Sequence, residues 1–309
     1  MKIIFMGTPE FAVASLDALI KAGMDVIAVV TAPDKPSGRG QQLSGSAVKK
    51  YAVKNSIKVL QPEKLKNEGF ITELKSLQAD LQVIVAFRML PEVVWNMPPK
   101  GTINLHASLL PQYRGAAPIN WAVINGEKET GVTTFFLKQE IDTGDVILTD
   151  KTSIPETDNA GDVHDKLMQI GADLLVKTVK IVTENNYKEV SQEKLIEQED
   201  EAIELKQAPK IFKNDCLINW LQPTEQVYNF IRGMSPFPTA FTYLNNKFFK
   251  VFKAEKEILE TGIAPGLYIT DQKTFLKFAC SDGFIVIKEA QLEGKKKMGI
   301  EDFLRGVKL

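Results

Sequence analysis

Two polar side chains in a short apolar run, Asn104 and His106, have the types and spacing needed for acyl-transfer chemistry. Apolar and polar residues alternate over residues 102–106, which predicts a β-strand with both side chains on one face. A neutral histidine near a carboxylate can carry a proton, and an asparagine amide can donate hydrogen bonds to an oxyanion. Asp142, in a later loop, would supply the carboxylate. The alternative is that His106 is a core histidine, Asn104 a turn residue and Asp142 a loop cap.

The elements that would position this pair belong to a parallel α/β sheet. Residues 2–6 form an apolar run typical of a strand buried on both faces. We expect a helix to follow, with Thr8 as its N-cap and Pro9 at its first position, and to end at Gly23. A second strand at residues 25–31 completes a βαβ unit, which implies a parallel sheet. Asn104 and His106 would then lie at the carboxyl edge of the sheet, where ligands bind in such folds.

Further elements follow the same logic. A buried strand is predicted at residues 81–87 and two further strands at residues 130–137 and 145–151, with Asp142 in the loop between the last two. A long helix is predicted at residues 163–182. Residues 32–46, which carry Lys35 and Arg39, read as an irregular loop. The first turn contains a single glycine, so a dinucleotide-binding motif is not supported.

The last third of the chain has a different pattern. Residues 189–208 are rich in charge, as in a linker. A strand at residues 211–220 and a helix at residues 227–232 come next. Short strands then follow, which predicts a small β-barrel; they are residues 240–244, 248–253, 266–270, 274–279 and 284–292. We therefore expect three parts: residues 1–188, a linker at residues 189–208, and a second domain at residues 209–309.

Composition limits the possible functions. The 309 residues are 44% hydrophobic and 25% charged, and no apolar run approaches the roughly 18–20 residues that cross a bilayer. Two isolated cysteines, Cys216 and Cys280, favour a reducing cytoplasm, and no cluster has metal-ligand spacing. From Glu204 onward there are 16 Lys/Arg against 12 Asp/Glu, whereas the whole chain has a net charge of −1. A basic C-terminal region on an acidic body permits a polyanionic partner.

The loop after the opening strand connects these residues to a family. The order Asn104, His106, Ser108, Leu109, Leu110 and Pro111, with the later Asp142, resembles the formyltransferases that use 10-formyltetrahydrofolate. The resemblance implies that Asn104, His106 and Asp142 are catalytic, that the segment from Ser108 to Pro111 belongs to the folate site, and that no metal is needed. Arg88, Met89 and Leu90 would border the pterin pocket, although the family often has Ala-Tyr-Gly and a longer turn there.

Segments near both ends of the chain narrow the resemblance to one group of members within that family. Residues 5–11, 33–40 and 235–238 are similar to the members of that family whose acceptor is methionyl-initiator-tRNA. This implies a Rossmann-like domain followed by an OB-like barrel that binds tRNA, and a monomeric enzyme of translation initiation. The product would be N-formylmethionyl-tRNA. Candidate tRNA contacts are all cationic; they are Arg39, Lys35, Lys210, Arg232, Lys295, Lys296 and Lys297.

Two alternatives remain at this point. The first is formyl transfer to a sugar nucleotide, or hydrolysis of the formyl-folate; a glycinamide ribonucleotide enzyme fits less well because it usually lacks a second domain. The second is an RNA-binding protein with an inactive α/β domain. The set of Asn104, His106 and Asp142 argues against the second alternative, and the loop around Arg39 argues against the first.

Overall fold

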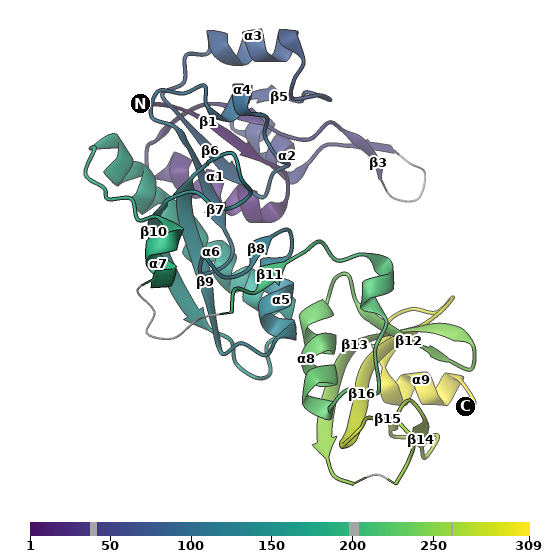
Figure 1. The fold of residues 1–309 in the computed structure, drawn as a ribbon. Coiled ribbons are helices and arrows are strands. Elements are labelled where there is room, and N and C mark those ends of the chain that lie inside the picture. The colour runs from purple at the N-terminus through teal and green to yellow at the C-terminus, as the bar shows by residue number, and fades with distance from the viewer. Residues whose placement is uncertain (38–41, 198–203, 261) are drawn as a thin grey trace. The chain divides into compact units, whose positions relative to one another are not determined.

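A mostly parallel sheet organises the first part of the chain in the computed structural model, which describes residues 1–37, 42–197, 204–260 and 262–309 (Figure 1). Its strand order is β10-β9-β7-β6-β1-β2-β5. The strands are β1 (Lys2–Gly7), β2 (Asp25–Val30), β5 (Lys58–Leu60), β6 (Leu81–Val85), β7 (Thr102–His106), β9 (Glu129–Phe136) and β10 (Val146–Ser153). The five from β5 to β7 run parallel, and β9 pairs antiparallel to β7.

The chain folds into two compact units. The first comprises residues 1–114, 131–152 and 164–206, and the second comprises residues 115–130, 153–163 and 207–309. The predicted α/β class and parallel sheet are confirmed for the first unit. The central strands β1 and β6 are almost continuously apolar because helices cover both faces of the sheet.

Helices of the first unit bury its two sheet faces. They are α1 (Glu10–Lys21), α2 (Ala47–Lys54), α3 (Glu68–Ser76), α4 (Glu92–Trp95), α6 (Ala160–Thr183) and α7 (Gln192–Glu197). Ile4 and Met6 of β1 share a core with Phe70 and Val94 of α3 and α4. On α6, Gly171 leaves room for Leu105 of β7, since a Cβ there would lie 3.0 Å from the leucine Cδ2. That close approach packs α6 directly behind the strand that carries Asn104 and His106.

Two local predictions in this unit were wrong. The predicted irregular loop at residues 32–46 contains paired strands, β3 (Lys35–Ser37) and β4 (Gln42–Ser44). Prolines and glycines in this segment conceal a pairing too short to show an alternating pattern. The N-cap of α1 is Pro9, not Thr8, and it makes no side-chain capping bond.

The second unit is built on an antiparallel sheet of order β12-β13-β16-β15-β14, with β17 paired to β16. Its elements are β8 (Arg114–Gly115), α5 (Pro118–Ile124), β11 (Gln207–Ala208), α8 (Thr224–Met234), β12 (Ala240–Leu244), β13 (Lys247–Ile258), β14 (Tyr268–Thr270), β15 (Leu276–Ala279), β16 (Gly283–Leu292), β17 (Met298–Gly299) and α9 (Ile300–Gly306). Helix α8 places Val227 and Ile231 against Phe249 and Ile285 of the sheet.

Sequence patterns located most strands of this sheet but misread its start. The predicted strand at residues 211–220 is instead a short 3-10 helix, η1 (Lys213–Cys216), followed by an extended segment. Ile218 and Trp220 are two residues apart and both point into the core. Trp220 stacks on Phe278 with ring centroids 4.7 Å apart. The alternation therefore reflects burial of an extended segment without a full ladder. Helix α9 and strand β17 were not predicted.

Candidate active site

Strand β7 places Asn104 and His106 at the carboxyl end of the parallel strands. Asn104 pairs in register with Ile84 of β6 and Phe135 of β9, and His106 lies opposite Thr133. Because they are two residues apart on a strand, both side chains project to one face. His106 is only 7% exposed, while Asn104 is half-buried. The predicted strand and its bounds are confirmed.

The imidazole of His106 lies between two acceptors. Its Nε2 is 2.9 Å from the main-chain oxygen of Tyr113, and its Nδ1 is 3.8 Å from Oδ2 of Asp142. Asp142 is itself 9% exposed. The structure thus brings together the histidine and the carboxylate that the sequence placed on separate segments. At 3.8 Å the contact is too long for a hydrogen bond, and it becomes an ion pair when the ring is protonated.

Asn104 differs from its neighbours because its amide is available. Its backbone belongs to the sheet, but among the described residues its side-chain amide has no hydrogen-bond partner, and it is not a fully buried unsatisfied group. An amide N–H that is free of protein partners can donate to an oxyanion that forms on a substrate carbonyl. The site therefore combines an uncharged donor with a histidine–carboxylate pair, which suits attack by an amine on an acyl carbon.

The loop from Ser108 to Pro111 is held firmly beside this pair. Ser108 is fully buried, and its hydroxyl donates to the carbonyl of Gln112 over 2.6 Å. Thr133 bridges the loop, because its hydroxyl donates to Ser108 O at 2.7 Å and accepts from Leu110 N at 3.1 Å. Leu110 packs in a small core with Phe135 and Val146. Ser108 thus fixes the shape of the loop, and the half-buried Leu109 and Pro111 are the residues that can contact a ligand.

The predicted pterin segment shows three different environments. Leu90 is buried, and Met89 is 71% exposed. The Arg88 guanidinium donates to the carbonyl oxygens of Glu63, at 2.8 Å, and Pro62. Burial lowers the pKa of Arg88, although an arginine stays charged. Arg88 therefore ties two loops together through main-chain acceptors.

The predicted tRNA contacts are also distributed unevenly. Arg39 lies outside the described residues, and Lys35 is exposed on β3. Lys295 and Lys296 are exposed, whereas Lys297 pairs with Glu289 at 2.7 Å. Arg232 is 5% exposed.

Arg232 differs from the exposed lysines because its side chain forms hydrogen bonds inside the second unit. Its guanidinium donates to Asn229 Oδ1 and Asp158 O, each at 2.8 Å, and burial lowers its pKa. Both of these acceptors belong to the second unit. The burial of Arg232 argues against a direct phosphate contact, so we do not carry it into the proposed tRNA site. The sequence alone does not show whether a charged side chain on a helix faces the core or the solvent.

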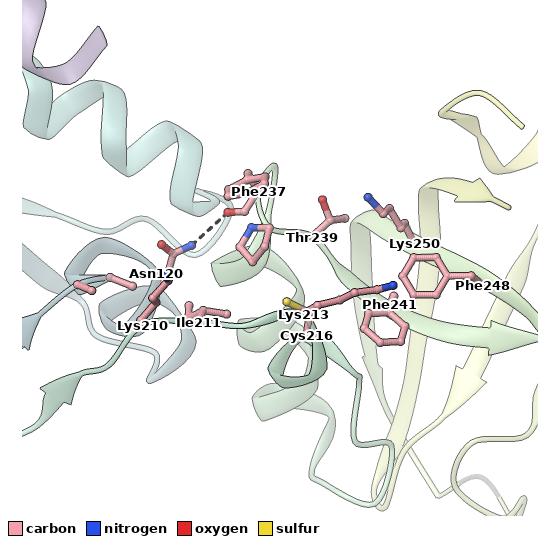
Figure 2. A pocket seen from close by; sticks show the side chains of 13 residues that line it. Asn120, Lys210, Ile211, Lys213, Cys216, Phe237, Thr239, Phe241, Phe248 and Lys250 are labelled. Atoms are coloured by element: carbon pink, nitrogen blue, oxygen red, sulfur yellow. Dashed lines mark hydrogen bonds between the residues drawn. The ribbon is translucent and has the colours of Figure 1, made fainter. Parts of the chain in front are cut away.

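Lys210 lies in a cavity of about 620 Å³ within the second unit (Figure 2). Two lysines that the sequence did not single out, Lys213 and Lys250, also line it. The Lys213 ammonium lies 5.3 Å from the ring centroid of Phe248. Phe237, whose carbonyl accepts from Asn120 at 3.3 Å, is 81% exposed. Lysines interleaved with aromatic rings are typical of sites that bind nucleic acids.

Two absences hold for the described parts of the chain. There is no cluster of three His, Cys, Asp or Glu side chains able to hold a metal ion within residues 1–37, 42–197, 204–260 and 262–309. In the same ranges no helix is long and apolar enough to cross a membrane.

The site contains one buried residue that sequence reasoning missed. Gln192 begins α7, in the segment predicted to be a linker, and its side chain bonds to the loop that carries Asp142. The segment is rich in charged residues, so its composition concealed this buried amide. The nearest apolar residue in the sequence, Val190, lies two positions before it and forms a bridge to Val146.

Matches to known families identify the chain as a formyl transferase. The family described as "Formyl transferase" matches residues 1–179, and the family described as "Formyl transferase, C-terminal domain" matches residues 210–308. Two solved structures share the fold. The sugar 3N-formyl transferase WlaRD has a TM-score of 0.66 at 21% identity, over 96% of this chain and 99% of that one. HypX from Aquifex aeolicus, in complex with tetrahydrofolic acid, has a TM-score of 0.66 at 18% identity, over 99% of this chain and 48% of that one.

Curated relatives are much more similar. The methionyl-tRNA formyltransferase of Bacteroides fragilis is 52% identical, over 100% of this chain and 96% of the relative. Those of Parabacteroides distasonis and Flavobacterium johnsoniae are 53% and 47% identical, with coverage of 100% and 99% of this chain and 96% of each relative. The chain belongs to the methionyl-tRNA formyltransferase family. The resemblance inferred from the sequence is thereby confirmed.

Proposed function

We propose that this enzyme transfers the formyl group of 10-formyltetrahydrofolate to the α-amino group of methionyl-initiator-tRNA, which gives N-formylmethionyl-tRNA for translation initiation. The observation that carries the proposal is the convergence of Asn104, His106 and Asp142 at one edge of the sheet, with the Asn104 amide free among the described residues. Family membership supplies the acceptor, and the folate ligands named for WlaRD and HypX support the donor.

Each residue of the trio has a stated role in this proposal. The amine attacks the formyl carbon, a new C–N bond forms, and the bond from that carbon to N10 breaks. Asn104 donates to the oxyanion of the tetrahedral intermediate. His106 and Asp142, directly or through water, take the proton of the attacking amine and pass it toward the leaving N10. The bound amine must be neutral to attack, which explains a histidine at this position.

The second unit binds the tRNA in our proposal. Lys210, Lys213 and Lys250 form no ion pair in the described parts of the chain, so their charges are available to phosphates. The exposed ring of Phe237 adds a stacking surface. We further propose that the antiparallel sheet is an OB-like barrel, that Arg39 and Lys35 reach the acceptor end, and that Lys295, Lys296 and Lys297 give a second phosphate contact.

The remaining parts of the proposal concern organisation. Residues 1–188 form the catalytic domain, residues 189–208 connect the two domains, and residues 209–309 bind the tRNA. Leu109 and Pro111 line the folate site, with Met89 and Leu90 at its border. Ser108 and Leu110 maintain its shape through buried contacts, and Arg88 through hydrogen bonds to main-chain oxygens. The enzyme acts as a monomer in the cytoplasm, without a metal.

One assay tests the function directly. The purified chain is incubated with 10-formyltetrahydrofolate and charged initiator tRNA, and formyl-methionyl-tRNA is measured. Product formation is expected; free formate without product would mean hydrolysis, and product only with an amino-sugar nucleotide would mean the sugar-directed activity. In Arg39→Ala, weaker formylation with unchanged folate binding is expected.

The cationic pocket has its own test. We expect Lys210→Ala and Lys213→Ala each to raise KM for tRNA, and to lower the slope of log affinity against log salt by about one unit per lysine. Lys308→Ala, an exposed cation outside the pocket, is the matched control. Unchanged salt slopes in both pocket variants would contradict the proposed contact.

A further inference from the structure

Gln192 uses all of its hydrogen-bonding capacity on two loops of the active site. Its side-chain nitrogen donates to Asp142 O over 2.8 Å and to Gly144 O over 2.9 Å. Its oxygen accepts from Arg114 Nε over 2.9 Å and from Arg114 Nη2 over 2.6 Å. The residue has no exposed surface. A buried amide that is satisfied at both ends rigidifies everything it touches.

The loop held by these bonds has a demanding conformation. Asp142 adopts a φ of 55°, in the left-handed region that few residues with a side chain occupy. Such backbone strain persists only when surrounding contacts over-determine it. Gln192 binds the main-chain carbonyl of Asp142 itself and that of Gly144, so a single NH₂ group fixes both ends of the turn. The direction of the Asp142 carboxylate follows from this backbone.

The other end of Gln192 contacts the segment that holds His106. Arg114 directly follows Tyr113, whose main-chain oxygen lies 2.9 Å from His106 Nε2. One side chain therefore joins the loop that orients Nε2 of the histidine to the loop that presents a carboxylate to Nδ1.

We propose that Gln192 is a positioning residue for formyl transfer, which acts by holding Asp142 in register with His106. The inference rests on the proposed function and assigns a role to a residue that does not touch the reacting groups. Because the amide sets geometry and not substrate affinity, its loss lowers kcat and leaves both KM values nearly unchanged. Small displacements of catalytic groups lower rates strongly, so we expect a loss of about tenfold to a hundredfold.

Two substitutions separate the two ends of the amide. Gln192→Met keeps the length of the side chain and removes every hydrogen bond. Gln192→Glu keeps an acceptor for Arg114 but turns an oxygen toward the carbonyls of Asp142 and Gly144. We expect Gln192→Glu to lower kcat at least as much as Gln192→Met, since the donors to the Asp142 loop carry the effect. Glu193→Gln, at the neighbouring exposed position of α7, is the matched control and keeps wild-type kcat.

A double-mutant cycle tests whether Gln192 acts through Asp142. Gln192→Met is combined with Asp142→Ala, and kcat, both KM values and the unfolding midpoint are measured for all four proteins. We expect the loss of kcat caused by Gln192→Met to shrink to about twofold or less when the carboxylate is absent. An equal loss in both backgrounds, or wild-type kcat in both Gln192 variants, overturns the inference. A wild-type protein without transferase activity would instead refute the proposed function.

Discussion

Nε2 of His106 lies 2.9 Å from the main-chain oxygen of Tyr113. A carbonyl oxygen only accepts, so this contact requires a hydrogen on Nε2. In the neutral ring Nδ1 is then the free lone pair, and it faces Asp142. The proton from an attacking amine would therefore be received on the side of the ring next to the carboxylate, where the positive charge is stabilised.

This tautomer can be measured. We expect ¹⁵N spectra of the free enzyme, recorded above the pH at which His106 loses its charge, to show a protonated Nε2 and a bare Nδ1. His164, which lies beside Asp165 on the exposed start of α6, provides an internal comparison. A neutral His106 with its hydrogen on Nδ1 would contradict the proposed direction of proton transfer.

Asn104 supplies the sharpest test of the chemistry. Removal of one oxyanion donor typically costs about 3–4 kcal/mol, so Asn104→Ala is expected to lower kcat by roughly a hundredfold or more with the fold intact. Asn104→Asp has nearly the same shape but lacks the N–H donors, and it should be as impaired as the alanine variant. Single-turnover kinetics with saturating tRNA would measure the step directly. A near-normal rate in either protein would remove Asn104 from the mechanism.

Gly144 cannot accept a side chain where it lies. A Cβ at this position would lie 1.6 Å from the main-chain oxygen of Phe136, so the loop after Asp142 would have to move. We expect Gly144→Ala to lower the free energy of unfolding by about 1–3 kcal/mol, and to lower kcat because Asp142 moves with the loop. Urea unfolding and steady-state kinetics check both effects. Gly306→Ala, where a Cβ would meet open space, should change neither.

Cys280 makes stability depend on alkaline pH. Burial raises the pKa of its thiol to about 12, from an ordinary value near 9. The folded state holds this proton while the unfolded state releases it, so unfolding is favoured increasingly as pH rises from about 9 to 12. We expect Cys280→Ala to reduce the alkaline decline of the urea midpoint between pH 9 and pH 11. An unchanged decline would show that other groups cause it.

How well each feature could be predicted from the sequence depended on how far apart in the chain its interacting residues lie. Strand β7 was predicted to the residue because alternation over residues 102–106 is a local property. The proposed catalytic trio came from the family resemblance carried by residue order, and the structure then placed Asp142 beside His106. By contrast, the burial of Arg232 could not be predicted, because it depends on acceptors more than 70 residues away. Gln192 was missed for the same reason, since its partners Asp142 and Arg114 are 50 and 78 residues distant.

Residues 115–130, which include α5, come from the middle of the chain but belong to the second unit. Asn120 of that helix donates to Gly233 O at the end of α8, and Trp121 donates to Pro209 O. Ile124 packs against the core of the antiparallel sheet. A protein cut after residue 206 would therefore keep α5 but lose the partners that cover it. The proposed catalytic residues would all be present, yet the apolar side chains of α5 would be exposed and the protein would tend to aggregate. The chemistry therefore cannot be isolated by simple truncation.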